Sequence, residues 1–158
     1  MDRVAVFVDV QNVYYTVKQI HGCHFDYRVF WDQVTARREV VCAFAYAIDR
    51  GDPKQIQFQQ ILQSIGFELK LKPFIQRSDG SAKGDWDVGI TIDMLELADG
   101  IDVAVLASGG GDFDLVVRKR REAYDVQVDV YGESKLTAAS LIQAANRFVP
   151  IEERLLMH

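Results

Sequence analysis

The sequence predicts an α/β protein, a three-layer α/β/α sandwich with a mainly parallel central sheet. Two observations lead to this fold class. Short apolar runs alternate with amphipathic segments along the whole chain, which is the pattern of strands joined by crossover helices. The apolar runs are also nearly continuous in Val, Ala, Ile and Phe, as expected for strands buried on both faces. The length of 158 residues suits a single domain, residues 1–158, with one core.

The first third of the chain begins with a strand and two helices. Its predicted elements are, in order, a buried strand at 3–10, helices at 11–21 and 26–36, and an apolar strand at 40–48.

A third helix has clear boundary signals. Asp52 is a suitable N-cap, Pro53 suits the first helical position, and Gly66 ends the helix. Its predicted buried stripe consists of Ile56, Ile61, Leu62 and Ile65.

The alternating segment 67–75 is predicted to be a strand with one solvated face. Pro73 favours a place at the sheet edge, where another copy could pair, so a homo-oligomer is an open expectation.

The second half continues the alternation. A polar loop at 77–85 precedes a helix at 85–99, a strand at 102–108, a helix at 112–123, a strand at 125–132 and a helix at 134–148 with Ser134 as its cap. Such a chain requires right-handed crossovers that place helices on both faces of the sheet. In sheets of this kind, functional groups gather at the carboxyl ends of the strands.

Composition and charge narrow the class of protein. The net charge of −5 argues against a protein that coats nucleic acid through charge alone, but it does not exclude an enzyme acting on nucleic acid. No segment approaches the length of a membrane span, and the first apolar run ends at Asp9 without a cleavage site. The two cysteines make no disulfide framework, so a cytoplasmic location is expected.

Acidic and polar residues follow several of the predicted strands. Asp9 closes the first strand with Asn12 just after it, Asp87 begins a helix, and Asp112 follows the strand that ends at Ser108. If these strands are neighbours, the carboxylates converge and repel one another unless a cation lies between them. Mg²⁺ or Mn²⁺, a hard ion that takes oxygen ligands, suits such a site. The alternative is structural, because strand-end acids also cap helices and complement their positive ends.

The glycine-rich loop and the basic residues leave further alternatives. The stretch LASGGGDFDLVV at 106–117 has neither of the glycine spacings typical of nucleotide binding. The basic run 118–121 is either a solvated helix face or a grip on a phosphate backbone. The candidate RNA-binding residues are Lys83, Arg118, Lys119 and Arg121, and the candidate base-stacking residues are Tyr14, Tyr15, Trp86 and Phe113, for which core packing is the alternative.

Several segments together resemble a known family. They are FVDVQN at 7–12, the segment 45–74, KGDWDVGITIDML at 83–95, VLASGGGDFDLVV at 105–117 and the segment 134–151. In this respect the chain resembles NYN domains of the LabA-like branch of the PIN-like nuclease superfamily. The resemblance implies a PIN-like, Rossmann-like sandwich and metal-dependent cleavage of RNA. It also implies functional roles for Asp9, Asn12, Asp87, Ser108 and Asp112.

The chain departs from the family pattern at one position. The first Asp of the usual SGDGDF motif falls on Gly110, so one expected carboxylate is missing. One hypothesis is a ribonuclease in which Asp9, Asp87 and Asp112 hold Mg²⁺ or Mn²⁺ directly or through water, while Asn12 and Ser108 orient groups around it. The alternative is a catalytically weakened module that binds RNA or a protein partner. A phosphatase with Asp9 as nucleophile ranks lower, because Gln11 stands where that design places a second Asp.

Overall fold

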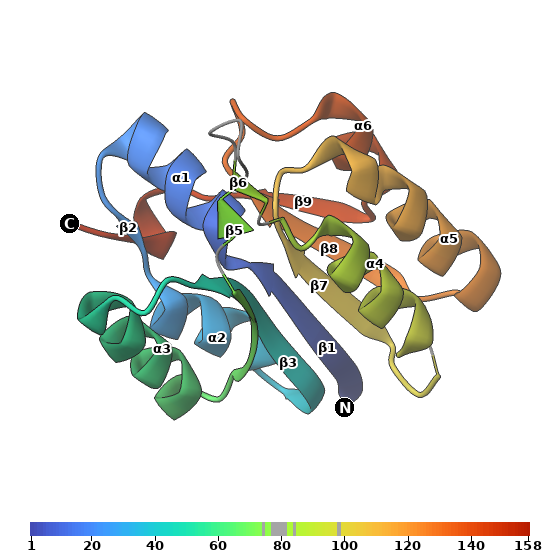
Figure 1. Ribbon diagram of the computed structural model, residues 1–158. Helices are drawn as coiled ribbons and strands as arrows, with labels where there is room; N and C mark the ends of the chain where they lie inside the picture. Colours follow the sequence, from blue (N-terminus) through green and yellow to red (C-terminus); the bar gives the residue numbers. More distant parts are fainter. Residues whose placement is uncertain (74, 77–81, 84, 98) are drawn as a thin grey trace.

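Six parallel strands form the centre of the molecule, with helices on both sides (Figure 1). The computed structural model describes residues 1–73, 75–76, 82–83, 85–97 and 99–158. The strand order is β4-β3-β1-β7-β8-β9, and every neighbouring pair is parallel. These strands are β1 (Asp2–Asp9), β3 (Arg38–Asp49), β4 (Glu68–Pro73), β7 (Val103–Ala107), β8 (Gln127–Gly132) and β9 (Arg147–Pro150). The predicted three-layer α/β/α sandwich is confirmed.

The helices form two outer layers (Figure 1). They are α1 (Val10–His21), α2 (Tyr27–Thr35), α3 (Pro53–Ile65), α4 (Asp87–Glu96), α5 (Asp114–Tyr124) and α6 (Ala139–Ala144). Strand β1 divides the core between them because successive side chains point to opposite faces. Val4, Val6 and Val8 pack with α1, α2 and α3, whereas Ala5 and Phe7 pack with α4, α5 and α6.

The strand order reverses between β1 and β7. From β1 the chain adds β3 and then β4 on one side, and β7 later enters on the other side of β1. Val8 of β1 lies opposite Ala107 of β7, so Asp9 and Ser108 leave the sheet next to each other. Open parallel sheets bind ligands in the crevice at such a reversal. Of the acids named from the sequence, Asp9 ends β1 and Asp112 follows β7, the two strands that flank this point, whereas Asp87 begins α4.

Helix α3 confirms its predicted ends and part of its predicted buried face. The Asp52 side chain accepts a hydrogen bond from the Lys54 amide, Pro53 opens the helix and Gly66 follows its end. Ile56 and Ile61, predicted as buried, are 45% and 44% exposed. Leu62 and Ile65 pack against the core as predicted, together with Phe58. Because α3 lies over the edge of the sheet, only this narrow stripe can be covered.

The predicted helix at 134–148 is wrong at both ends. Only α6 is helical there, Ala138 rather than Ser134 precedes it, and residues 147–150 form β9. The Glu133 carboxylate accepts hydrogen bonds from the Lys135 and Leu136 amides, which holds the segment before α6 in a turn. After α6, the Asn146 amide donates to the Val128 carbonyl and starts the parallel pairing with β8.

Shorter elements complete the fold. Of the predicted loop at 77–85, residues 82–83 form β6 (Ala82–Lys83), which pairs antiparallel with β5 (Ile75–Gln76), while 77–81 and 84 lie outside the described residues. A 3-10 turn, η1 (Gly111–Phe113), leads into α5. Near the end of the chain, η2 (Glu153–Leu155) precedes β10 (Leu156–Met157), which pairs with β2 (His24–Phe25). No helix within the described part of the chain is long and apolar enough to cross a membrane.

Candidate active site

Asp9 is fixed by two hydrogen bonds where β1 meets α1. Its side chain is 8% exposed. The Ser108 hydroxyl donates to Asp9 Oδ2 at 3.2 Å, and the Asn12 amide donates to Asp9 Oδ1 at 3.3 Å. The second bond caps α1, so the structural interpretation of Asp9 holds. Capping uses only one oxygen, however, and the other accepts a hydrogen bond from Ser108, which follows β7.

Backbone amides of the glycine-rich loop hold the Ser108 and Asn12 side chains in place. The Gly110 amide donates to Ser108 Oγ at 3.3 Å, and the Gly109 amide donates to Asn12 Oδ1 at 2.9 Å. Two amides of the loop are therefore engaged within the protein and cannot cradle a phosphate. Ser108 is fully buried, so it acts by holding Asp9 rather than by touching a ligand. Asn12 likewise joins α1 to the loop after β7.

Gly109 is a position of close approach, which gives a stability prediction. A Cβ added there would lie 2.9 Å from the Leu136 carbonyl oxygen and 3.0 Å from Thr137 Oγ1. We expect Gly109→Ala to destabilise the fold by about 2 kcal/mol, because backbone must move to admit the methyl group. Denaturant unfolding measures this loss. Gly110→Ala is the matched control and should cost less, since its Cβ would meet only the ring edge of Phe113 at 3.2 Å and Ser108 Oγ at 3.7 Å.

Four acids influence one another around Asp9. Burial raises the pKa of Asp9 from 3.8 to about 6, with smaller contributions from the charges of Asp87 and Asp85. The pKa of Asp87 is also raised, first by burial, then by Asp85 and Asp112, while Lys72 opposes this rise. The acids that are separated in the sequence therefore act in one electrostatic environment. Perturbed carboxyls that share a cleft are typical of functional sites.

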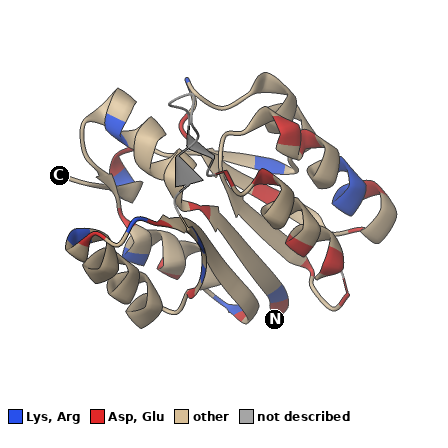
Figure 2. Cartoon of the chain, in the orientation of Figure 1, with Lys and Arg blue, Asp and Glu red and all other residues tan. Residues whose placement is uncertain are grey.

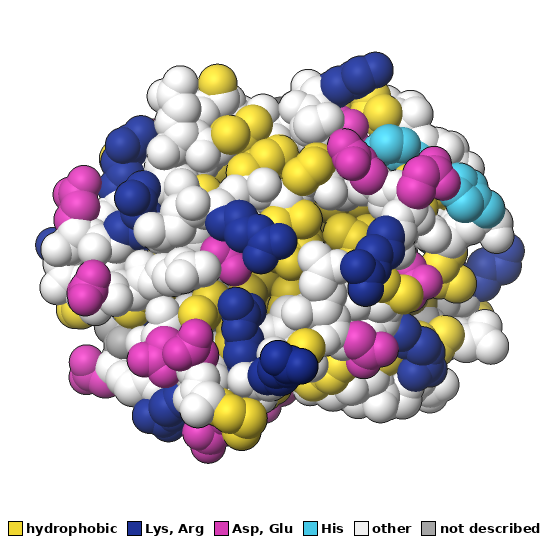
Figure 3. Space-filling model, turned by 180° about the vertical axis from the view of Figure 1, so that it is seen from behind, with side chains coloured by type: hydrophobic (Ala, Val, Ile, Leu, Met, Phe, Trp, Pro, Cys, Tyr) yellow, Lys and Arg dark blue, Asp and Glu magenta, His cyan; other side chains and the backbone are white. Residues whose placement is uncertain are grey.

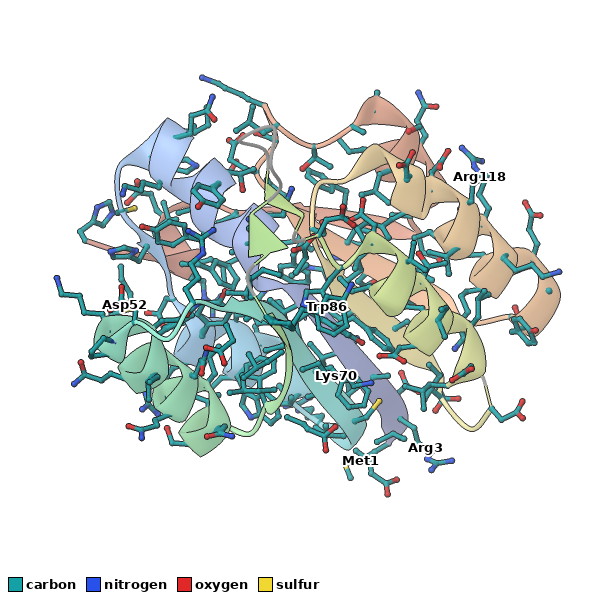
Figure 4. All side chains as sticks on the ribbon, in the orientation of Figure 1. Met1, Arg3, Asp52, Lys70, Trp86 and Arg118 are labelled. Atoms are coloured by element: carbon teal, nitrogen blue, oxygen red, sulfur yellow. The ribbon has the colours of Figure 1, made fainter. Side chains whose placement is uncertain are left out.

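A hollow of about 440 Å³ opens above Asp9. The side chains and backbone that line it come from α1, the end of β3, the start of α4 and the glycine loop: Asp9, Gln11, Asn12, Tyr15, Thr16, Ile48, Arg50, Asp85, Asp87 and Gly110. Trp86 holds the start of α4 against β3 through its indole N–H, which donates to the Ala47 carbonyl at 2.9 Å (Figure 4). This anchor places Asp85 and Asp87 on the rim.

The acids fit a hydrated divalent ion better than a closed cage of protein ligands. Within the described residues, no three His, Cys, Asp or Glu side chains are close enough to hold an ion together. Asp112 is exposed and does not line the hollow. Mg²⁺ is commonly held by one or two carboxylates, with water and substrate oxygens completing its shell. Asp9 and Asp87, which line one hollow, meet that requirement.

The predicted RNA-binding residues lie elsewhere. Arg118 and Arg121 line a second hollow with Asp2 and Asp102, at the amino ends of the strands and so at the opposite edge of the sheet from Asp9. Figure 4 shows Arg118 on the outer side of α5, away from Trp86. Lys119 is exposed on α5. The backbone of Lys83 lies in β6, and its side chain is outside the described residues.

Charge is mixed over the surfaces in view. In Figure 2, basic and acidic positions are interspersed, and α4 carries acidic positions without a basic one. From behind, Lys, Arg, Asp, Glu and apolar side chains share the surface (Figure 3). Among the described residues on the face drawn in Figure 3, no continuous basic surface of the kind that binds nucleic acid through charge alone is seen.

Comparison with known proteins decides the family. Residues 3–152 match the family described as the NYN domain. The chain belongs to the NYN domain family. It is 29% identical to the low amplitude and bright protein LabA of Synechococcus elongatus, over 96% of this chain and 84% of LabA. A Vibrio parahaemolyticus protein of unknown function has the same fold, with a TM-score of 0.94 and 51% identity over 99% of this chain and 96% of that one.

As an NYN domain of the LabA-like type, the chain confirms the resemblance drawn from its motifs. Neither Asp85 nor Arg50 was among the candidate site residues, yet both line the hollow. The signal for Asp85 was its place two residues before Asp87. Arg50 follows the end of a long strand and carries no comparable signal, because only the sheet order brings β3 beside β1.

Proposed function

We propose that this NYN domain is a metal-dependent ribonuclease that hydrolyses phosphodiester bonds of RNA at the Asp9 hollow. The observation that carries the proposal is the environment of Asp9. A buried carboxylate with a raised pKa, beside Asp85 and Asp87, is unfavourable for the fold unless a cation balances it. Membership of a PIN-like family supports the same activity.

The roles of the residues follow from the geometry. Asp9 and Asp87 would hold Mg²⁺ or Mn²⁺, and Asp112 would act on it through water. A bound ion of this kind lowers the pKa of a coordinated water and balances charge on the phosphate. Ser108 and the Asn12 amide hold both Asp9 oxygens in place, so that little reorganisation is needed when RNA binds. The proposal also includes RNA as the binding partner and the cytoplasm as the location of the protein.

One observation favours a second candidate function. Gly110 lines the hollow where the family motif has an Asp, and no group of three ligating side chains is present among the described residues. An NYN domain with so few anionic ligands binds a divalent ion weakly. The second candidate is therefore a regulatory module that binds RNA at the same hollow without cutting it.

The first test compares two Asp→Asn substitutions. We expect Asp87→Asn to lower Mn²⁺-dependent cleavage of labelled single-stranded RNA by roughly 10- to 100-fold, the range for a lost supporting group at a metal site. The control is Asp125→Asn, at the far end of α5, where φ is 52° and Asn is readily accommodated. Equal cleavage by wild type and Asp87→Asn, or cleavage that persists in EDTA, would contradict the proposal.

A further inference from the structure

An aromatic residue lines the hollow together with its acids. Tyr15 of α1 lines it together with Asn12, one helical turn earlier, while Asp85 and Asp87 come from the start of α4. The Tyr15 side chain is 49% exposed, so its ring does not serve the core. An exposed aromatic ring on the wall of a polar hollow has a surface suited to a planar, partly apolar ligand group.

The Tyr15 ring is held by its neighbour. The rings of Tyr14 and Tyr15 meet edge to face, with centroids 5.2 Å apart and an interplanar angle of 81°. Tyr14 is fixed in turn: its ring stacks on His24 at 6.0 Å, and Lys18 Nζ donates to its hydroxyl at 3.3 Å. Tyr14 thus contacts the ring of Tyr15, a residue that lines the hollow. A ring already oriented in this way loses little conformational entropy when it stacks on a ligand.

A cation shares the hollow with this ring. Arg50 follows β3 and lines the same space as Tyr15 and the acids. Its guanidinium can approach a phosphate bidentately, whereas the carboxylates repel an anion until a divalent ion binds. The hollow therefore combines three different environments: carboxylates for a cation, an aromatic face for a base and a guanidinium for a phosphate.

We propose that Tyr15 is the stacking platform for one unpaired nucleobase of the RNA and that Arg50 contacts a neighbouring phosphate, which makes single-stranded RNA the ligand. This inference rests on the proposed function, because it assigns the substrate to the same hollow. A tyrosine ring stacks on any base, so binding depends on the presence of a base and not on its identity. A base within a duplex is covered on both faces by its neighbours and is not available to Tyr15.

Binding without cleavage tests the inference. The probe is a fluorescein-labelled oligouridylate in buffer with Ca²⁺. The comparison probe is an abasic chain of the same length, which has the same phosphates but no bases. We expect Tyr15→Ala to weaken oligouridylate binding roughly 5- to 150-fold, the effect of one stacked base, with little change for the abasic chain. Tyr15→Phe keeps the ring and should retain the affinity. Tyr124→Ala, which removes a 44% exposed ring on α5, is the matched control.

Salt dependence separates the two contacts. We expect Arg50→Gln to reduce the slope of log affinity against log salt by about 0.7, the contribution of one phosphate on a single strand. Tyr15→Ala should leave the slope unchanged. The inference is overturned if the wild type does not bind the oligouridylate, if it binds both probes equally, or if Tyr15→Ala binds the oligouridylate as tightly as the wild type.

The outcomes distinguish this inference from the proposed function. Tyr15-dependent binding without Mn²⁺-dependent cleavage would remove the ribonuclease and leave the stacking platform. Cleavage with the same KM in wild type and Tyr15→Ala would remove the platform and leave the ribonuclease.

Discussion

Asp9→Asn is expected to remove RNA cleavage and at the same time to make the fold more stable. Cleavage should fall by at least roughly 100-fold, because the substitution takes away the best-positioned carboxylate of the hollow. The fold should gain because Asp9 is 8% exposed and its pKa is raised from 3.8 to about 6. A shift of this size corresponds to about 3 kcal/mol of unfavourable free energy at neutral pH. Most side-chain substitutions in a buried site have the opposite sign.

The gain depends on pH in a defined direction. Because the folded state holds the Asp9 proton more tightly than the unfolded chain, wild-type stability falls as the pH rises from 3.8 to about 6 and stays lower above that. The stability of Asp9→Asn does not fall in this way, because asparagine has no carboxyl group to titrate. It keeps an acceptor for the Asn12 amide, but one of its two oxygens is replaced by a donor that faces Ser108. We therefore expect a net gain of about 2 kcal/mol at pH 7, or roughly 4–8 °C in Tm.

Thermal unfolding of both proteins between pH 4 and pH 7.5, without divalent ions, measures this difference. Asp125→Asn serves again as the control and should show no gain that grows with pH. Mn²⁺ should then stabilise the wild type more than Asp9→Asn, because it binds the folded carboxylate. If the difference in Tm between the two proteins does not vary with pH, the raised pKa of Asp9 does not destabilise the fold and the prediction is contradicted.

Gly110→Asp is expected to strengthen metal binding and raise cleavage. At Gly110 the backbone has φ −66° and ψ 128°, a conformation open to every residue. The new Cβ would lie 3.2 and 3.3 Å from two ring carbons of Phe113, so the ring must shift by a few tenths of an ångström. The added carboxylate joins Asp9, Asp85 and Asp87 on the hollow. We expect about tenfold tighter Mn²⁺ binding, equivalent to roughly 1.4 kcal/mol.

Gly110→Asn separates charge from shape. It adds a side chain of the same size without the negative charge, so it should share any steric cost but not the gain in metal affinity. Calorimetric titration with Mn²⁺, combined with cleavage assays, compares the two variants. If Gly110→Asp binds Mn²⁺ no more tightly than Gly110→Asn, the hollow is not a metal site and the binding module becomes the better description.

The centre of the site was predictable because it depends on strand ends. Asp9 and Ser108 each follow a run of buried residues, and parallel strands bring their carboxyl ends to one edge. Their pairing depends on β1 and β7 being neighbours, which the sequence left as a condition and the sheet order confirms. The position of Arg118 was harder to foresee, because a helix that begins near the acids carries its later residues toward the other edge of the sheet.

Patterns of apolar residues failed where a segment lies at the edge of the molecule. The spacing of Ile56 and Ile61 suits a buried helix face, yet α3 covers only the edge of the sheet and leaves both exposed. The segment 134–148 has a helical composition, but hydrogen bonds to Glu133 and Val128 divide it into a turn, a short helix and an edge strand. The turn at Glu133 is local, but Val128 belongs to the neighbouring strand β8, and a local pattern does not show that pairing.

The backbone at Gly110 also bears on how this chain can change over generations. Glycine occupies the position without any conformational need for it, and glycine and aspartate codons can differ by a single base. A single point mutation therefore separates the present loop from one with the full acidic motif, and only the Phe113 ring would have to shift to admit the side chain. Gain or loss of this carboxylate therefore requires no change in the backbone angles of the loop.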